Sequence, residues 1–147
     1  MSSLVDIAAE RGVLAGLAKY GSSLNIELSD IIDINWFSKE FNQIIYKCFA
    51  SILLNSSQID IPSVLSVSNQ FGFSKIFEST QNLTFLKSLW EFPILEVNCL
   101  VLGKKLRKLE IARKCQTRLK EAWEQLEQLK GDEPIDEILT KFESPII

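Results

Sequence analysis

The chain has 147 residues, of which 46% are hydrophobic and 24% are charged, so it can bury a core and is not disordered by composition. Histidine is absent, which excludes His-based catalytic triads, His general bases and His metal ligands. The net charge of −3 argues against a protein that binds nucleic acid through an overall basic surface.

Cysteine and hydropathy patterns bear on the compartment. The three cysteines, Cys48, Cys99 and Cys115, are odd in number and far apart, so neither a disulfide framework nor a zinc site is expected. A reduced, intracellular protein is the plain interpretation. Charged residues among the first eleven positions argue against a signal peptide. The longest apolar stretch, Pro93 to Leu102, is too short to span a membrane.

The first predicted element is a helix from Leu4 to Tyr20. Ser3 is expected to cap it, with Asp6 in its first turn, and Gly21 to end it. Small residues recur on one face of this helix, where another helix could approach closely. They are Ala8, Gly12, Ala15 and Gly16.

Three more helices are predicted in the middle of the chain. Residues 31–54 carry apolar side chains at steps of three and four, which predicts a helix with one broad buried face. Asp60 and Pro62 are typical of a helix start, the turn at residues 71–73 follows, and residues 83–90 form another short helix. A strand is conceivable at residues 24–28, but no alternation is long enough to require a sheet. The predicted class is all-α.

The last third of the chain predicts one long helix. From Ile94 to about Lys130 only Gly103 interrupts the helical pattern. Its apolar residues form a narrow stripe typical of a coiled coil. The stripe consists of Leu102, Leu106, Leu109, Ala112, Cys115, Leu119, Ala122, Leu126 and Leu129. After a turn at Gly131, Pro134 can start a second helix through residues 135–142.

The length of this helix decides the architecture. A helix over residues 94–130 would be roughly 55 Å long, whereas a compact chain of this size has a radius of gyration of about 15 Å. The helix must therefore bend near Gly103 or project beyond the rest. We expect a small helical head over residues 1–93, followed by a projecting helical hairpin and the start of a linker over residues 94–147. The returning helix covers only part of the stripe, so the remainder should meet another chain.

Charge is segregated within the hairpin. Eight Lys and Arg against one Glu give residues 104–120 a net charge of +7, and eight acidic residues against two Lys give residues 121–143 a net charge of −6. Three interpretations stay open: a solvated helix surface, complementary docking between hairpins or partners, and phosphate binding by the basic segment. The four lysine and arginine candidates for nucleic-acid binding are Lys104, Lys105, Arg107 and Lys108.

The sequence lacks the motifs of common enzymes. A phosphate-binding loop requires a glycine-rich pattern ending in Gly-Lys-Ser/Thr, and Gly103-Lys104 is followed by lysine. No dinucleotide-binding fingerprint occurs, and no Ser or Cys has a histidine to activate it. We therefore expect a chain that is not an enzyme and uses no cofactor or metal.

The order of several motifs resembles the N-terminal domain of DnaB-type replicative DNA helicases. Residues 9–14 (AERGVL) are similar to that family's A-E-x-x-V-L opening. The pair Phe37 and Asn42 resembles its F-x-x-x-x-H helix, with asparagine in place of histidine. Ile59-Asp60 followed by Val64 resembles its I-D-x-x-T-V. The family's later asparagine and arginine match Asn98 and Arg113, with apolar Leu102, Leu106, Ile111 and Ala112 between them. Ala15 and Leu102 also depart from the family's glycine and tyrosine.

The resemblance implies a non-catalytic assembly domain. In the family this domain pairs through its hairpins in a hexamer and docks the C-terminal domain of primase, and sometimes a helicase loader. The ATPase of the parent helicase lies in a separate domain. The resemblance thus implies a role in DNA replication, in the cytoplasm of a bacterial or phage-infected cell or in the plastid stroma. Two alternatives remain: a freestanding helical adaptor that binds a replication protein, and a nucleic-acid-binding module.

The apolar stripe and the residues beside it supply the candidates for self-association and for partner docking. The expected oligomer interface comprises Ala112, Cys115, Leu119, Ala122, Leu126 and Leu129. The expected docking residues are Arg113, Arg118 and Trp123. Trp123 is either an exposed contact residue or a side chain packed under the last helix, and its size favours burial. Arg113 either takes part in docking or ties the hairpin to the head.

Overall fold

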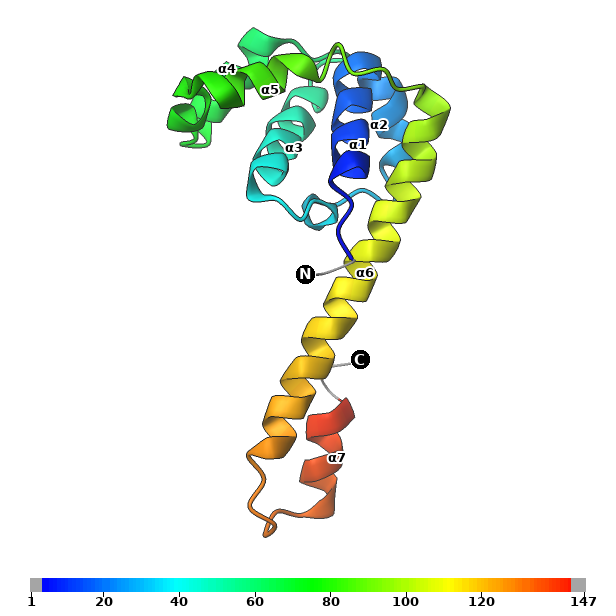
Figure 1. The fold of residues 1–147 in the computed structure, drawn as a ribbon, viewed down its shortest axis with the longest axis vertical. Helices are drawn as coiled ribbons and strands as arrows, with labels where there is room; N and C mark the ends of the chain where they lie inside the picture. The colour runs from blue at the N-terminus through cyan, green and yellow to red at the C-terminus, as the bar shows by residue number, and fades with distance from the viewer. Residues whose placement is uncertain (1–3, 144–147) are drawn as a thin grey trace.

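The computed structural model describes residues 4–143, which form seven α-helices, two 3₁₀ helices and no strand. The head contains α1 (Ile7–Tyr20), α2 (Ser22–Leu28), η1 (Ile34–Trp36), α3 (Glu40–Leu53), α4 (Ile61–Gln70), η2 (Ser74–Glu78) and α5 (Thr80–Ser88). The long helix α6 (Glu96–Glu127) runs along the head and beyond it, and α7 (Ile135–Glu143) returns beside its far end (Figure 1). The all-α class is thereby confirmed.

Helix α1 lies at the centre of the head, between α3 and α6 (Figure 1). Asp6 caps it by accepting a hydrogen bond from the backbone N–H of Ala9 at 2.9 Å. The helix therefore begins later than Leu4, and Ser3, the expected cap, lies outside the described residues. Gly21 ends the helix as expected, with a φ of 59°.

The small residues of α1 allow α6 to approach. A Cβ atom on Gly12 would lie 2.7 Å from Cδ1 of Leu102. A Cβ atom on Gly16 would overlap Sγ of Cys99 and lie 2.9 Å from Cδ2 of Leu24. Of the predicted close-packing face, Gly12 and Gly16 therefore lie where α6 rests, whereas Ala8 is exposed.

Two expectations in the next segment are wrong. Residues 24–28 belong to α2, because Leu24 and Leu28, spaced four apart, bury one helical face completely. The next helix begins at Glu40 rather than at residue 31. The reason is η1, in which the Asp33 carboxylate accepts from the backbone N–H of Asn35 and the chain then becomes extended.

The first residues of α4 and α5 lie closer to the positions predicted from the sequence. The Asp60 carboxylate caps α4 through the backbone N–H of Ser63 at 2.9 Å, and Pro62 lies in its first turn. Helix α5 begins at Thr80, ahead of the expected residue 83, because Ser79 caps it. Within residues 4–143, no helix is long and apolar enough to cross a membrane.

Helix α6 projects and does not end at its glycine. It has 32 residues, and at 1.5 Å per residue its length is about 48 Å. Gly103 is buried, and a Cβ atom there would lie 3.0 Å from Leu28 and 3.1 Å from Trp36. The absence of a side chain at Gly103 therefore lets α6 pack closely against the head. The lower half of α6 extends past the head (Figure 1).

Candidate interaction surface on the projecting hairpin

The projecting hairpin is closed by a capped turn. Gly131 has a φ of 96°, a conformation that favours glycine. The Glu133 carboxylate accepts from the backbone N–H groups of Lys130 at 2.9 Å and Gly131 at 2.8 Å. The hydrogen bond from the backbone N–H of Lys130 is the main cause that lowers the pKa of Glu133. The turn at Gly131 and the helix after Pro134 are as predicted.

The apolar stripe of α6 is divided between two faces. Its upper residues, Leu102 and Leu106, pack in the head, whereas Ala122 is buried beyond the head where α7 packs. At about 100° per residue, Ala122 lies roughly 160° around the helix from Leu106. The expectation of one seam along the whole helix is therefore wrong, because the stripe rotates around a straight helix.

The hairpin leaves much apolar surface exposed. Six large side chains there are about half exposed or more: Ile111 (49%), Leu119 (54%), Trp123 (66%), Ile135 (74%), Leu139 (49%) and Phe142 (51%). The three in α7 are spaced by four and three residues and so share one face. The part of the chain that the structure describes leaves about half or more of each of these side chains uncovered.

The expected interface residues are not equally accessible. Cys115 and Leu119 are exposed, Ala112, Leu126 and Leu129 are half-buried, and Ala122 is buried. Trp123 is 66% exposed, so the interpretation that it packs under α7 is wrong. The small Ala122 side chain occupies the buried position, and Trp123, next in sequence, points about 100° away from it.

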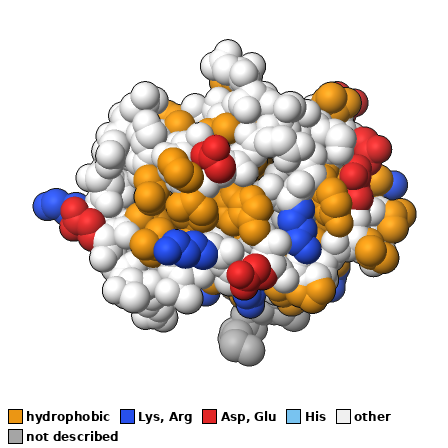
Figure 2. Space-filling view, turned by 90° about the horizontal axis from the view of Figure 1, so that it is seen from above, with side chains coloured by type: hydrophobic (Ala, Val, Ile, Leu, Met, Phe, Trp, Pro, Cys, Tyr) orange, Lys and Arg blue, Asp and Glu red, His pale blue; other side chains and the backbone are white. Residues whose placement is uncertain are grey.

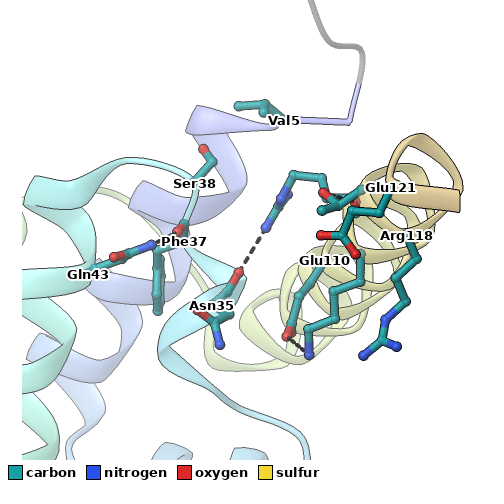
Figure 3. Close-up of a pocket in the computed structure, with 11 residues that line it drawn as sticks. Val5, Asn35, Phe37, Ser38, Gln43, Glu110, Arg118 and Glu121 are labelled. Atoms are coloured by element: carbon teal, nitrogen blue, oxygen red, sulfur yellow. Dashed lines mark hydrogen bonds and ion pairs between the residues drawn. The ribbon is translucent and has the colours of Figure 1, made fainter. Parts of the chain in front are cut away.

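Arg113 ties α6 to the head. Its guanidinium donates to the backbone carbonyls of Leu4 and Asn35, both at 2.8 Å, and to that of Trp36 at 3.4 Å. Figure 3 shows the hydrogen bond to Asn35 across an open hollow of about 800 Å³ between the head and α6. Arg118 lines the α6 side of this hollow, opposite Gln43. Of the two roles considered for Arg113, the structure shows the one in which it holds the hairpin to the head.

The basic residues of α6 have different surroundings. Lys105 forms an ion pair with Asp6, and this hydrogen bond is the main cause that lowers the pKa of Asp6. Lys114 pairs with Glu110 at 2.8 Å. Lys104 and Lys108 are exposed and form no ion pair within residues 4–143. Of the nucleic-acid candidates, Lys105 is thus already used in holding α6 to α1.

A second apolar surface lies at the end of the head away from the hairpin. Seen from above, hydrophobic side chains gather across this end, with a few charged side chains among them (Figure 2). Leu54 and Leu95, at the end of α3 and the start of α6, are 82% and 65% exposed. This surface was not predicted, because Leu54 and Leu95 lie at the ends of helices predicted over residues 31–54 and from residue 94 onward, and periodicity does not show which helix ends stay exposed.

Two motif positions far apart in sequence contact each other. The Glu10 carboxylate is fully buried and accepts from Nδ2 of Asn42 at 3.0 Å and from Oγ of Ser38 at 2.6 Å. Asparagine at position 42 keeps a side-chain N–H donor where the helicase family has histidine. This pair joins α1 to the start of α3.

Comparison with known proteins agrees with this architecture. No protein-family model and no curated protein sequence matches the chain. Among solved structures, the chain is similar to the crystal structure of the N-terminal domain of DnaB helicase from Mycobacterium tuberculosis, with a TM-score of 0.71 and 16% identity. The similarity covers 99% of this chain and 98% of that chain. The expected likeness to this domain is confirmed at the level of the fold.

Proposed function

We propose that this chain is a non-catalytic assembly domain of a hexameric replicative DNA helicase, and that it pairs with a second copy through the α6–α7 hairpin. The observation that carries the proposal is the exposed apolar surface of the hairpin, which projects from a head with the fold of a helicase N-terminal domain. The role in replication rests on the resemblance in sequence motifs and on the similarity of fold.

The physical reason is the cost of leaving this surface in water. Burial of a large apolar side chain contributes about 1.5–3 kcal/mol. The six exposed side chains of the hairpin are already partly covered, so each would contribute a fraction of that value. A second copy can cover them without any change in the head, because the hairpin extends beyond it (Figure 1).

The substitution Leu119→Asp tests this proposal. Wild-type protein should form dimers as its concentration rises in sedimentation velocity. The introduced aspartate would place an unpaired charge in the contact, so the dimer dissociation constant should rise roughly a hundredfold or more.

The matched control is Thr117→Asp, which adds the same charge at an exposed position about 160° around the helix from Leu119. It should dimerise like the wild type. Circular dichroism should show that both variants are folded. Equal dimerisation of the Leu119→Asp variant and the wild type would contradict the hairpin as the interface.

The proposed external partner is the C-terminal domain of primase, with a helicase loader as a further candidate. Exposed tryptophan is enriched among residues that dominate binding energy. Trp123→Ala should therefore weaken binding of the primase domain at least about tenfold in a titration, and Arg118→Ala less. Gln116→Ala, an exposed neutral change on α6, is the control.

If Trp123→Ala binds like the wild type and Leu54→Asp or Leu95→Asp abolishes binding, primase docks on the far end of the head. The hairpin would then serve assembly alone. The alternative of nucleic-acid binding has weaker support, because Lys105 pairs with Asp6 and the chain is acidic overall.

A further inference from the structure

The segment before α1 runs beside α6 and contacts it at two points (Figure 1). At the first point, the Asp6 carboxylate accepts a hydrogen bond from Nζ of Lys105. At the second, the backbone carbonyl of Leu4 accepts from Nη1 of Arg113 at 2.8 Å. Lys105 and Arg113 are eight residues apart, so the two contacts are separated by about 12 Å along α6. We define residues 4–6 as the strap.

Asp6 connects the strap to the head as well as to α6. Its Oδ1 accepts from the backbone N–H of Ala9 at 2.9 Å and caps α1, while its Oδ2 accepts from Lys105. One carboxylate therefore joins the central helix of the head to α6. The Arg113 guanidinium adds a second link, because it donates both to the strap and to the backbone carbonyl of Asn35 in η1 at 2.8 Å.

Both contacts of the strap lie at or below the end of the apolar attachment of α6. Among the residues that the structure describes, the last α6 side chain in the apolar cluster of the head is Leu106. Arg113 lies seven residues further, about 10 Å along the helix, and Glu124 lies eighteen residues further, about 27 Å. If α6 pivots at Leu106, an outward movement of about 1 Å at Arg113 moves the helix by about 3 Å at Glu124. A small change at the strap is therefore amplified in the hairpin.

The contacts of the strap are ones that water can replace. The side chains of Lys105 and Asp6 are 56% and 24% exposed, and ion pairs between exposed groups are weak and screened by salt. Val5, between the two contacts, lines the open hollow between the head and α6 (Figure 3). Long helices such as α6 bend gently without losing their backbone hydrogen bonds. The strap can therefore be released while the head and α6 stay folded.

We propose that the strap fixes the angle at which the hairpin leaves the head, and that its release lets the lower half of α6 swing away from the head. Arg113 keeps the hollow closed on one side as long as the carbonyls of Leu4 and Asn35 hold it. A contact that draws residues 4–6 away from α6 thus redirects the hairpin without touching it. This device does not depend on whether two copies pair.

Distances between two spin labels test the proposal. One label replaces the exposed Lys39, just before α3, and the other replaces the exposed Glu124, in a Cys115→Ser background. The remaining thiols of Cys48 and Cys99 are buried, and this burial raises the pKa of each to about 11, so they should not react with the label. Dilution with unlabelled chain removes distances between copies.

Two substitutions release the strap in different ways. Asp6→Asn keeps a side-chain cap for α1 but removes the charge that pairs with Lys105. Arg113→Ala removes the links to the strap and to η1. Each should broaden the distance distribution about twofold and shift it to longer distances, with an unchanged circular dichroism spectrum. The matched control is Lys108→Ala, which removes an exposed α6 cation that forms no ion pair within residues 4–143, and it should match the wild type.

Each outcome decides for or against the strap. Broadening in both variants with an unchanged control supports it. A distribution like that of the wild type in both variants overturns it, because apolar packing down to Leu106 then fixes the hairpin alone. Broadening in Arg113→Ala but not in Asp6→Asn also overturns it, because the link to η1 then suffices. If Arg113→Ala does not fold, Asp6→Asn decides together with Lys105→Gln, which breaks the same ion pair from the α6 side.

Discussion

The substitution Gly16→Ala should destabilise the protein by about 3 kcal/mol, at the upper end of the usual cost of overpacking a core. The added Cβ atom would overlap Sγ of Cys99 and lie 2.9 Å from Leu24, so α1 and α6 would have to separate or the sulfur would have to move. Alanine has a helix propensity about 1 kcal/mol better than glycine, and this gain offsets only part of the cost. Chemical denaturation monitored by circular dichroism measures the change.

A second substitution shows whether the overlap is the cause. In the double variant Gly16→Ala, Cys99→Ala the sulfur is absent, and the nearest atom of residue 99 would be its Cβ at 3.3 Å. The double variant should therefore be more stable than Gly16→Ala alone, although Cys99→Ala by itself removes a buried group. Additive losses from the two changes would show that α1 and α6 do not pack through this contact.

The large helices could be predicted from sequence because their signals are local. The long helix α6, the cap at Asp60 and the turn at Gly131 follow from periodicity and from capping chemistry. The late start of α3 could not be foreseen, since the side-chain cap of Asp33 interrupts a run in which apolar residues recur at helical spacings. The strand considered at residues 24–28 is wrong because so short a helix carries too few residues to show its period.

The candidate site was only partly predictable. The stripe on α6 suggests one surface because its spacings of three and four are typical of a coiled coil. Five of its eight steps are three residues long, however, and each of these falls about 60° short of a full turn, so the stripe rotates around a straight helix. Which part faces the head and which faces α7 depends on where the head ends along α6. The apolar end of the head could not be predicted, because the exposure of Leu54 and Leu95 depends on which helix ends the fold leaves uncovered.

The buried contact between Glu10 and Asn42 connects the sequence motifs to the architecture. Helix α1 packs against both α3 and α6, so its position fixes the surface on which α6 rests. Glu10 is fully buried, and Asn42 is only 2% exposed. The Asn42 amide donates its hydrogen bond to the Glu10 carboxylate. Loss of this carboxylate should therefore loosen α3 against α1.

We expect Glu10→Ala to destabilise the protein by about 3 kcal/mol, because it leaves the Asn42 amide unsatisfied and opens a cavity in the head. Ser38 is half-buried and can find water, so most of the loss should come from Asn42. Glu10→Gln should cost much less, since its amide oxygen can accept from Asn42 while its N–H donates to Ser38. Thermal and denaturant unfolding of the three proteins measures this order. If Glu10→Gln is as unstable as Glu10→Ala, the head requires the carboxylate itself, and hydrogen bonding alone does not explain the burial of Glu10.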